Sequence, residues 1–281
     1  MGTSTSSGGP GPGVSMDPPW LDDLGSELPS LPNDGNTEVP NDDKKEPKKD
    51  NPNQEVAPPR RFADARRYLG NYARSGDRTS FRKSMGHYSK TGMGGAQNIS
   101  KRMRVSTKAT AGLVSFINDV KNEATPEISD WHKNLISKNP TPNEIIDAIV
   151  QRVTNEGGTL DEDSIKNSMT FAMSEMLTTD PDIDLLNMGS NEVWTLIENV
   201  LSYEAKSRIE LDIGQIFESS KLTPVQQVER SNEMYEYLKA EIVAQIKPFR
   251  EKDPDPEITR LDAIMRQAIE NTFAVFEEEI E

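Results

Sequence analysis

The residues best suited to chemistry lie at the start of the chain, in the sequence MGTSTSSGGPGPG. Removal of Met1 would leave Gly2 with a free α-amine of pKa about 7.7–8.0, so that roughly a tenth of it is the neutral nucleophile at pH 7. A lysine amine, with a pKa of about 10.4, offers far less. Glycine has no Cβ, and a leader of serine, glycine and proline can thread into a narrow enzyme tunnel. We interpret this terminus as a substrate; the alternative is a disordered leader without a function.

The same leader fits the N-myristoylation pattern, because Gly2 is followed by Ser6 at the required position. The pattern is short, and a single acyl chain gives only marginal membrane binding without a neighbouring basic patch. The tail that follows is acidic, which opposes binding to anionic lipid. We therefore expect no membrane attachment.

Residues 1–59 are predicted to form a disordered acidic tail, since they hold eleven prolines and seven glycines and show no apolar periodicity. One stretch, DPPWLDDLGSELPSLP, is different because it carries a tryptophan and several leucines. Trp20, Leu21 and Leu24 are typical of a linear motif that docks in the groove of a partner. A chance cluster, or a segment that folds back on its own domain, remains an open alternative.

Composition limits the class of protein. The 281 residues are 33% apolar and 6% aromatic with a mean hydropathy of −0.70, which is low for a chain folded from end to end. The absence of cysteine excludes disulfides, thiolate metal sites and cysteine nucleophiles, and it fits an intracellular location. No secretory leader or membrane-spanning stretch is present in the sequence. We expect a soluble cytoplasmic protein.

The formal charge of −15 is the sum of three unlike regions. Residues 1–59 carry −7, residues 60–108 carry +11 and residues 109–281 carry −19. The chain is therefore divided into a disordered tail (1–59), a basic helical segment with glycine-rich turns (60–121) and an acidic α-helical domain (122–281).

The basic segment is predicted to form short helices over Phe62–Ser75 and Thr79–Tyr88, then a longer one over about Ala96–Lys121. The sequence GHYSKTGMGGA between them can take turns closed to residues other than glycine. Cations interleaved with aromatic rings suggest a nucleic-acid or partner surface. The candidate contact residues are Arg60, Arg61, Arg66, Arg67, Arg74, Arg78, Arg82, Lys83, Lys101, Arg102 and Arg104. Alternatively, these side chains lie against the acidic C-terminal helices of the same chain or against an acidic partner.

The C-terminal region is predicted to be a helical bundle, so the fold class is mostly α. Capping boxes with proline at the first helical position begin at Thr141 and Thr223. Apolar residues recur at steps of three and four over Ile145–Val153, Ile165–Met176 and Ile258–Ile280. The methionines in this pattern are interpreted as core residues rather than as a ligand surface.

No catalytic centre is expected. Neither His87 nor His132 has neighbours that indicate a relay or a metal site. Residues 180–184 carry aspartate at alternate positions, as a calcium loop does, but Leu185 stands where that loop needs glycine and Asn191 where it needs glutamate. The glycine-rich segment lacks the features of a phosphate-binding loop. We predict a non-enzymatic protein without a metal or an intrinsic cofactor.

Several segments of the first 120 residues form a specific combination. They are the MGTS start with its GGPGPG run, the proline-rich acidic tail containing Trp20-Leu21, the Arg60-Arg61-Phe62 and Arg74-Ser75-Gly76 triplets, and GHYSKTGMGGA leading to Lys101-Arg102-Met103. Together these segments resemble the QatB proteins of the bacterial Qat anti-phage defence systems. The resemblance covers about residues 1–120.

This resemblance implies a defence operon that also encodes an ATPase, a QueC-like enzyme and a TatD-like nuclease. QueC-type enzymes activate 7-carboxy-7-deazaguanine as an adenylate, which ammonia then attacks. In the QueC-like defence enzymes, an N-terminal glycine amine is understood to replace ammonia, which leaves a covalent 7-amido-7-deazaguanine. By this resemblance Gly2 is the acceptor, and Thr3, Ser4, Gly8 and Gly9 enter the enzyme.

Three functional hypotheses follow. The first is a modified substrate whose helical body acts as an adaptor for the operon partners. The second is a nucleic-acid-binding subunit that uses residues 60–108 to present DNA or RNA to the nuclease. The third is a scaffold whose tail is inert.

Overall fold

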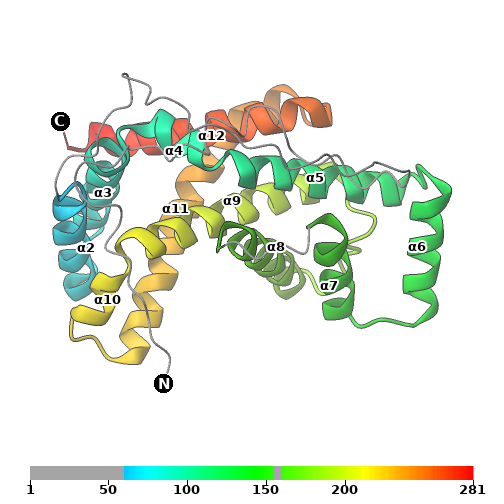
Figure 1. Cartoon of the computed structure of the whole chain (residues 1–281), viewed down its shortest axis with the longest axis horizontal. Helices are drawn as coiled ribbons and strands as arrows, with labels where there is room; N and C mark the ends of the chain where they lie inside the picture. The colour runs from blue at the N-terminus through cyan, green and yellow to red at the C-terminus, as the bar shows by residue number, and fades with distance from the viewer. Residues whose placement is uncertain (1–59, 155–159, 281) are drawn as a thin grey trace, which may run out of the picture.

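The computed structural model describes residues 60–154 and 160–280, and every regular element in these ranges is a helix (Figure 1). The predicted all-helical class is therefore confirmed for the described residues, whereas the predicted tail lies outside them. The elements are α2 (Ala63–Ser75), α3 (Arg78–His87), the π-helix η1 (Tyr88–Met93), α4 (Ala96–Arg102), α5 (Arg104–Lys121), α6 (Pro126–Ser137), α7 (Pro142–Val153), α8 (Leu160–Thr179), α9 (Ser190–Ile213), α10 (Gln215–Ser219), α11 (Pro224–Lys252) and α12 (Ile258–Glu278). None of the helices in these ranges combines the length and apolar character that crossing a bilayer requires.

The first helices of the basic segment form close to where the sequence predicts them. Both α2 and α3 begin and end within one residue of the predicted ranges. Gly76 terminates α2 in the left-handed conformation, with φ 71°. The side chain of Asp77 then caps α3 by accepting the backbone N–H groups of Thr79 and Ser80 at 3.1 and 2.9 Å.

The predicted helix over Ala96–Lys121 is wrong in one respect, because it is two helices. The break lies at Met103, between α4 and α5. The Oγ of Ser100 donates a hydrogen bond to the carbonyl oxygen of Arg266 on α12 at 2.9 Å, and the side chain of Met103 is 1% exposed in the core. Packing of α4 against α12 accompanies the break, at a point where the sequence has neither glycine nor proline.

The glycine-rich segment confirms the need for glycine. After the single π-helical turn η1, Gly94 and Gly95 have φ values of 77° and 109°, a conformation that other residues rarely adopt. The chain can therefore reverse direction between η1 and α4 without strain.

The predicted starts of the C-terminal helices are also confirmed. In the box that begins α7, the backbone N–H of Thr141 donates to Glu144 Oε2 at 2.7 Å, and the N–H of Glu144 donates to Thr141 Oγ1 at 3.3 Å. Thr223 and Gln226 form the same reciprocal pair at the start of α11. Both pairs satisfy backbone donors that a helix start otherwise leaves without a partner.

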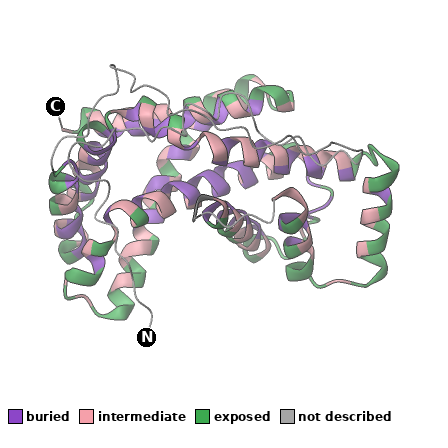
Figure 2. Cartoon of the chain, viewed as in Figure 1, coloured by how far each residue is buried: buried purple, intermediate pink, exposed green. Residues whose placement is uncertain are grey.

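Two hydrophobic clusters hold the helices together (Figure 2). The first joins α2–α5 to α9, α11 and α12, and the second joins α5, α7 and α8 to α9. The predicted core methionines of α8, Met169, Met173 and Met176, are buried in the second cluster. Both α5 and α9 contribute to both clusters, and α9 is the central element because it packs against α5, α8, α10 and α11. The basic segment thus shares a core with the C-terminal helices, and the division at residue 121 stays a prediction.

One glycine sets how closely α3 can approach α12. A methyl group at Gly86 would lie 2.4 Å from the carbonyl oxygen of Phe276, closer than real Cβ contacts allow. Gly112, in the middle of α5, has no atom within 4 Å of the same position. The two residues are both helical glycines, but only the first is required by packing.

We therefore predict that Gly86→Ala destabilises the protein by about 1–3 kcal/mol, because the two backbones must move apart. Gly112→Ala should be neutral or stabilising by up to about 1 kcal/mol, since alanine favours the helix and nothing obstructs it. Urea unfolding followed by circular dichroism checks both values. Equal effects of the two substitutions would contradict the packing role of Gly86.

Candidate functional site

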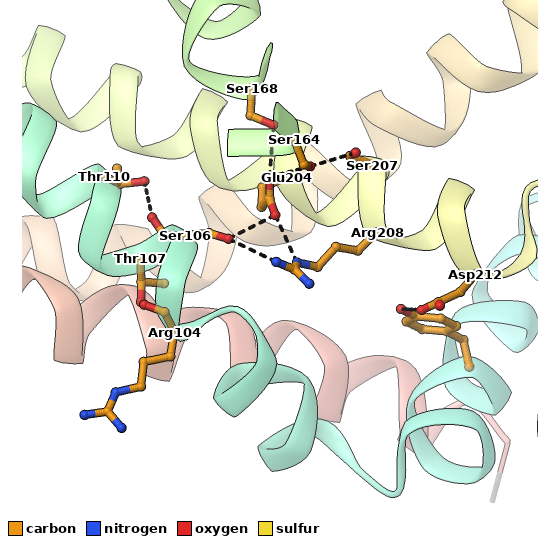
Figure 3. Close-up of polar contacts among 11 residues, drawn as sticks. Arg104, Ser106, Thr107, Thr110, Ser164, Ser168, Glu204, Ser207, Arg208 and Asp212 are labelled. Atoms are coloured by element: carbon orange, nitrogen blue, oxygen red, sulfur yellow. Dashed lines mark hydrogen bonds and ion pairs between the residues drawn. The ribbon is translucent and has the colours of Figure 1, made fainter. Parts of the chain in front are cut away.

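Three charged residues lie in a row on the central helix, where the surrounding packing is mostly apolar. Glu204, Arg208 and Asp212 are spaced four residues apart on α9, so they fall on one face of the helix. Figure 3 shows Glu204 and Arg208 turned toward Ser106 of α5. A buried charge is costly unless hydrogen bonds and an opposite charge satisfy it. The contacts of this row therefore decide whether it is tolerated.

The carboxylate of Glu204 is 0% exposed and has four partners. Its Oε1 accepts hydrogen bonds from Arg208 Nε and Ser106 Oγ, both at 2.9 Å. Its Oε2 accepts from Ser164 Oγ at 2.9 Å and Ser168 Oγ at 3.2 Å. The donors come from α5, α8 and α9, so one carboxylate links three helices (Figure 3).

Asp212 lies two turns further along α9 and bonds to the basic segment. The phenol of Tyr88 donates to Asp212 Oδ2 at 2.8 Å, and Arg66 Nη2 donates to the backbone carbonyl of Asp212 at 3.0 Å. Burial raises the pKa of the Asp212 carboxyl, and the hydrogen bond from Tyr88 and nearby arginines only partly oppose this shift. Burial also raises the pKa of Tyr88 well above its usual value, so the phenol remains a donor.

Some of the predicted basic contact residues turn inward. Arg61 is buried, and its guanidinium lies 4.7 Å from the centre of the Phe62 ring. Arg82 forms ion pairs with Glu279 at 2.8 Å and Glu241 at 3.8 Å. For these side chains and for Arg66, the contacts are with the chain itself, as the alternative interpretation of the basic segment expects.

Other predicted contact residues remain at the surface. Arg67 pairs with Asp64 at 3.2 Å, and Arg78 lies 5.0 Å from the ring centre of Tyr237. Lys83 lies 5.9 Å from the ring centre of Tyr68. The exposed candidates are Arg60, Arg67, Arg74, Arg78 and Lys101, and the half-buried ones are Arg66, Arg82, Lys83, Arg102 and Arg104. Nucleic-acid binding by this set stays a prediction.

The remaining candidates from the sequence do not form a catalytic or metal-binding cluster within the described residues. The ring of His87 stacks on Tyr68 with centroids 5.3 Å apart, and burial lowers the pKa of His87. The side chains of Asp180 and Asp184 accept backbone N–H groups of nearby residues and so close local turns. Within ranges 60–154 and 160–280, no three histidine, aspartate or glutamate side chains are grouped to hold a metal ion. Gly2 and the Trp20 motif lie outside the described residues.

Sequence reasoning missed the row on α9. The signal was present as Glu204, Arg208 and Asp212 at intervals of four, but that spacing also describes an exposed pair on a helix surface. Only the partners on α5, α8 and η1 distinguish the two cases, and these come from distant parts of the chain.

The described structure is an all-helical protein whose central helix carries a row of charges that is buried at Glu204 and half-buried at Arg208 and Asp212. A sequence model of the family described as "Qat anti-phage system associated protein QatB" matches residues 94–276, more than half of the chain. The chain belongs to the QatB family and is a component of a Qat anti-phage system. The family match overlaps the segments that carried the sequence resemblance, which lie within about residues 1–120, only over residues 94–120. No curated protein and no solved structure matches the chain.

We predict that Glu204→Ala destabilises the protein by about 3–5 kcal/mol, because it removes the carboxylate that the half-buried Arg208 and three serine hydroxyls share. Glu251→Ala is the control, since Glu251 forms an exposed pair with Lys247 at 3.8 Å. The control should change stability by no more than about 0.5 kcal/mol. Denaturant unfolding measures both, and a small effect at Glu204 would refute the role of the network.

Asp212→Asn should become more favourable relative to the parent as the pH rises. The folded state holds the Asp212 proton more tightly than the unfolded chain, whose aspartate has a pKa of about 3.9. The resulting stabilisation is complete below that pKa and is lost as the pH rises through the raised value. Asparagine does not titrate but can still accept the Tyr88 hydroxyl.

The free energies of unfolding of parent and Asp212→Asn, measured in urea from pH 4 to pH 7, test this trend. Asp130→Asn serves as the control, because Asp130 is exposed on α6. The prediction fails if the two variants depend on pH in the same way.

Proposed function

We propose that this chain is the non-enzymatic, modified component of its Qat system. The observation that supports the proposal most directly is the leader of residues 1–13, in which Gly2 would offer an unhindered amine of low pKa on a segment able to thread into an enzyme. The QatB family membership supplies the context of a defence operon.

The proposed reaction is an acyl transfer. The neutral amine of Gly2 attacks the acyl carbon of a 7-deazaguanine adenylate held by the QueC-like partner. The new C–N bond forms as the bond from the acyl carbon to the AMP oxygen breaks, AMP leaves with the electron pair, and the amine loses a proton. The product is an amide between Gly2 and the deazaguanine. The adenylate requires ATP, which fits a reaction in the cytoplasm.

The helical body is proposed to act as an adaptor for the QueC-like enzyme, the ATPase and the TatD-like nuclease. What supports this role is the way the tail joins the body. The ring of Phe62 stacks on Tyr88 at a centroid distance of 5.7 Å, and Arg66 bonds to α9. The described chain therefore begins at a fixed point, from which a tail of 59 residues can carry its terminus to a partner.

Intact mass of the chain, untagged at its N-terminus and produced with its operon neighbours, tests the modification. We expect loss of Met1 and a gain equal to one deazaguanine acyl group, mapped to Gly2 and absent when the QueC-like gene is deleted. Gly2→Pro should abolish the gain, because its amine is secondary and hindered. Gly35→Pro, which lies in the same tail but far from Gly2 in sequence, should retain the gain in mass.

Both variants should keep the circular dichroism of the parent, so that a loss of modification is not a loss of fold. Loss of Met1 alone in every sample would overturn the proposal.

A further inference from the structure

A pocket of about 260 Å³ lies between α8 and α9, on the outer side of the Glu204 network. Hydroxyls of Ser164, Ser168 and Ser207 line it together with the rings of Phe171 and Tyr203. We propose that this pocket binds the indole ring of Trp20 from the tail of the same chain. The proposal is independent of the modification of Gly2.

The serine hydroxyls can offer the pocket only lone pairs. Ser164 and Ser168 each have one hydroxyl hydrogen, and both donate it to Glu204 Oε2. Ser207 lies 2.9 Å from Ser164, oxygen to oxygen, and it must be the donor in that bond because the Ser164 hydrogen is already used. The buried carboxylate thus leaves these serine hydroxyls as acceptors, whereas Asn167, which also lines the pocket, has an amide that can accept or donate. The group that the serines can bind is a hydrogen-bond donor.

The aromatic side of the pocket is incompletely covered. Tyr203 stacks on Tyr235 with centroids 4.3 Å apart, and Tyr235 is held by a hydrogen bond from its hydroxyl to Glu175. The ring of Phe171 lies 5.6 Å from that of Tyr203, centroid to centroid, but Phe171 is 53% exposed, which is unusual for so large an apolar residue. A second planar ring placed here would cover Phe171 and gain aromatic contacts.

The charges beside the pocket favour an uncharged occupant. Lys206 and Glu210 both line it and pair with each other at 3.2 Å, so neither sign is in excess. The pocket volume is also below the roughly 300–1,000 Å³ of sites that hold drug-sized ligands. A single neutral ring system matches both limits better than a nucleotide or a helix does.

Trp20 has the required chemistry. Its indole is planar and neutral, and its N–H is a donor without an acceptor. It is the one aromatic residue in the sequence of residues 1–59, and the sequence around it shows the features of a docking motif. Residues 1–59 therefore contain one side chain, Trp20, with the aromatic ring and the hydrogen-bond donor that this pocket can bind.

The pocket lies close to the point where the tail joins the body. Arg66, six residues after Arg60, bonds to Asp212, and Asp212 is only six residues from Lys206 along α9, or roughly 9 Å of helix. The 40 residues from Trp20 to Arg60 have a root-mean-square span of roughly 35 Å as a flexible chain. Docking within one chain is therefore geometrically easy.

Docking would divide the tail in two. The 18 residues from Gly2 to Pro19 would remain beyond the anchor, with a root-mean-square span of roughly 23 Å, and the Trp20 motif would be hidden from partners until displaced. The body would thereby control access to the motif without hindering the terminus.

The test uses the full chain labelled with 5-fluorotryptophan at its three tryptophans and observed by ¹⁹F NMR. Trp20→Phe identifies the Trp20 resonance by its loss. We expect this resonance to be displaced from its position in the urea-unfolded chain and to show a reduced H₂O/D₂O isotope shift. Phe171→Ala should abolish both effects while the resonances of Trp131 and Trp194 stay in place, which shows that the core is intact.

Ile136→Ala is the matched control, because Ile136 is also a large exposed apolar residue but lies on α6. It should leave the Trp20 resonance unchanged. The proposal would be overturned if the Trp20 resonance of the parent lay at its position in the unfolded chain. It would also be overturned if Phe171→Ala left that resonance unchanged. A displacement that grows with protein concentration would also overturn it, since the occupant would then come from a second copy.

Discussion

The fold depends on one buried carboxylate. Glu204 sits on the central helix, where its two oxygens accept four hydrogen bonds and its charge faces Arg208. Removing this carboxylate is expected to cost several kcal/mol, because buried serine hydroxyls lose their acceptor and the half-buried Arg208 loses its opposite charge. The helices that supply the serine donors, α5 and α8, are therefore held in register with α9 by directional bonds as well as by apolar packing. The hydrophobic clusters on either side of α9 supply the bulk of the burial, whereas the network specifies the arrangement.

The same helix joins the basic segment to the acidic region. Asp212 receives the phenol of Tyr88 and the guanidinium of Arg66, while Arg82 reaches Glu279 and Glu241. Part of the positive charge of residues 60–108 thus lies in hydrogen bonds and ion pairs inside the molecule. This reduces the charge available to a polyanion, and it explains how regions of +11 and −19 can share one hydrophobic core. The exposed candidates, which are Arg60, Arg67, Arg74, Arg78 and Lys101, are the part of this charge that faces solvent.

The QatB assignment and the proposed roles concern different parts of the chain. The family match covers residues 94–276, within the helical body, whereas the proposed acceptor Gly2 and the Trp20 motif belong to residues 1–59. The described residues begin at Arg60, and the pocket between α8 and α9 is the place proposed for Trp20. The two proposals together assign the chemistry to the terminus and its positioning to the helical body.

The sequence by itself determined the helical class, the capped starts of α7 and α11, the glycine-dependent turn at Gly94 and the core positions of the α8 methionines. These follow from local rules, namely capping, periodicity and backbone freedom, which depend only on near neighbours. Tertiary structure alone decided the break at Met103, the burial of Glu204 and the inward turn of Arg66 and Arg82. In each case the cause is a partner many residues away, and a charge on a helix has the same sequence signature whether it meets water or a buried serine.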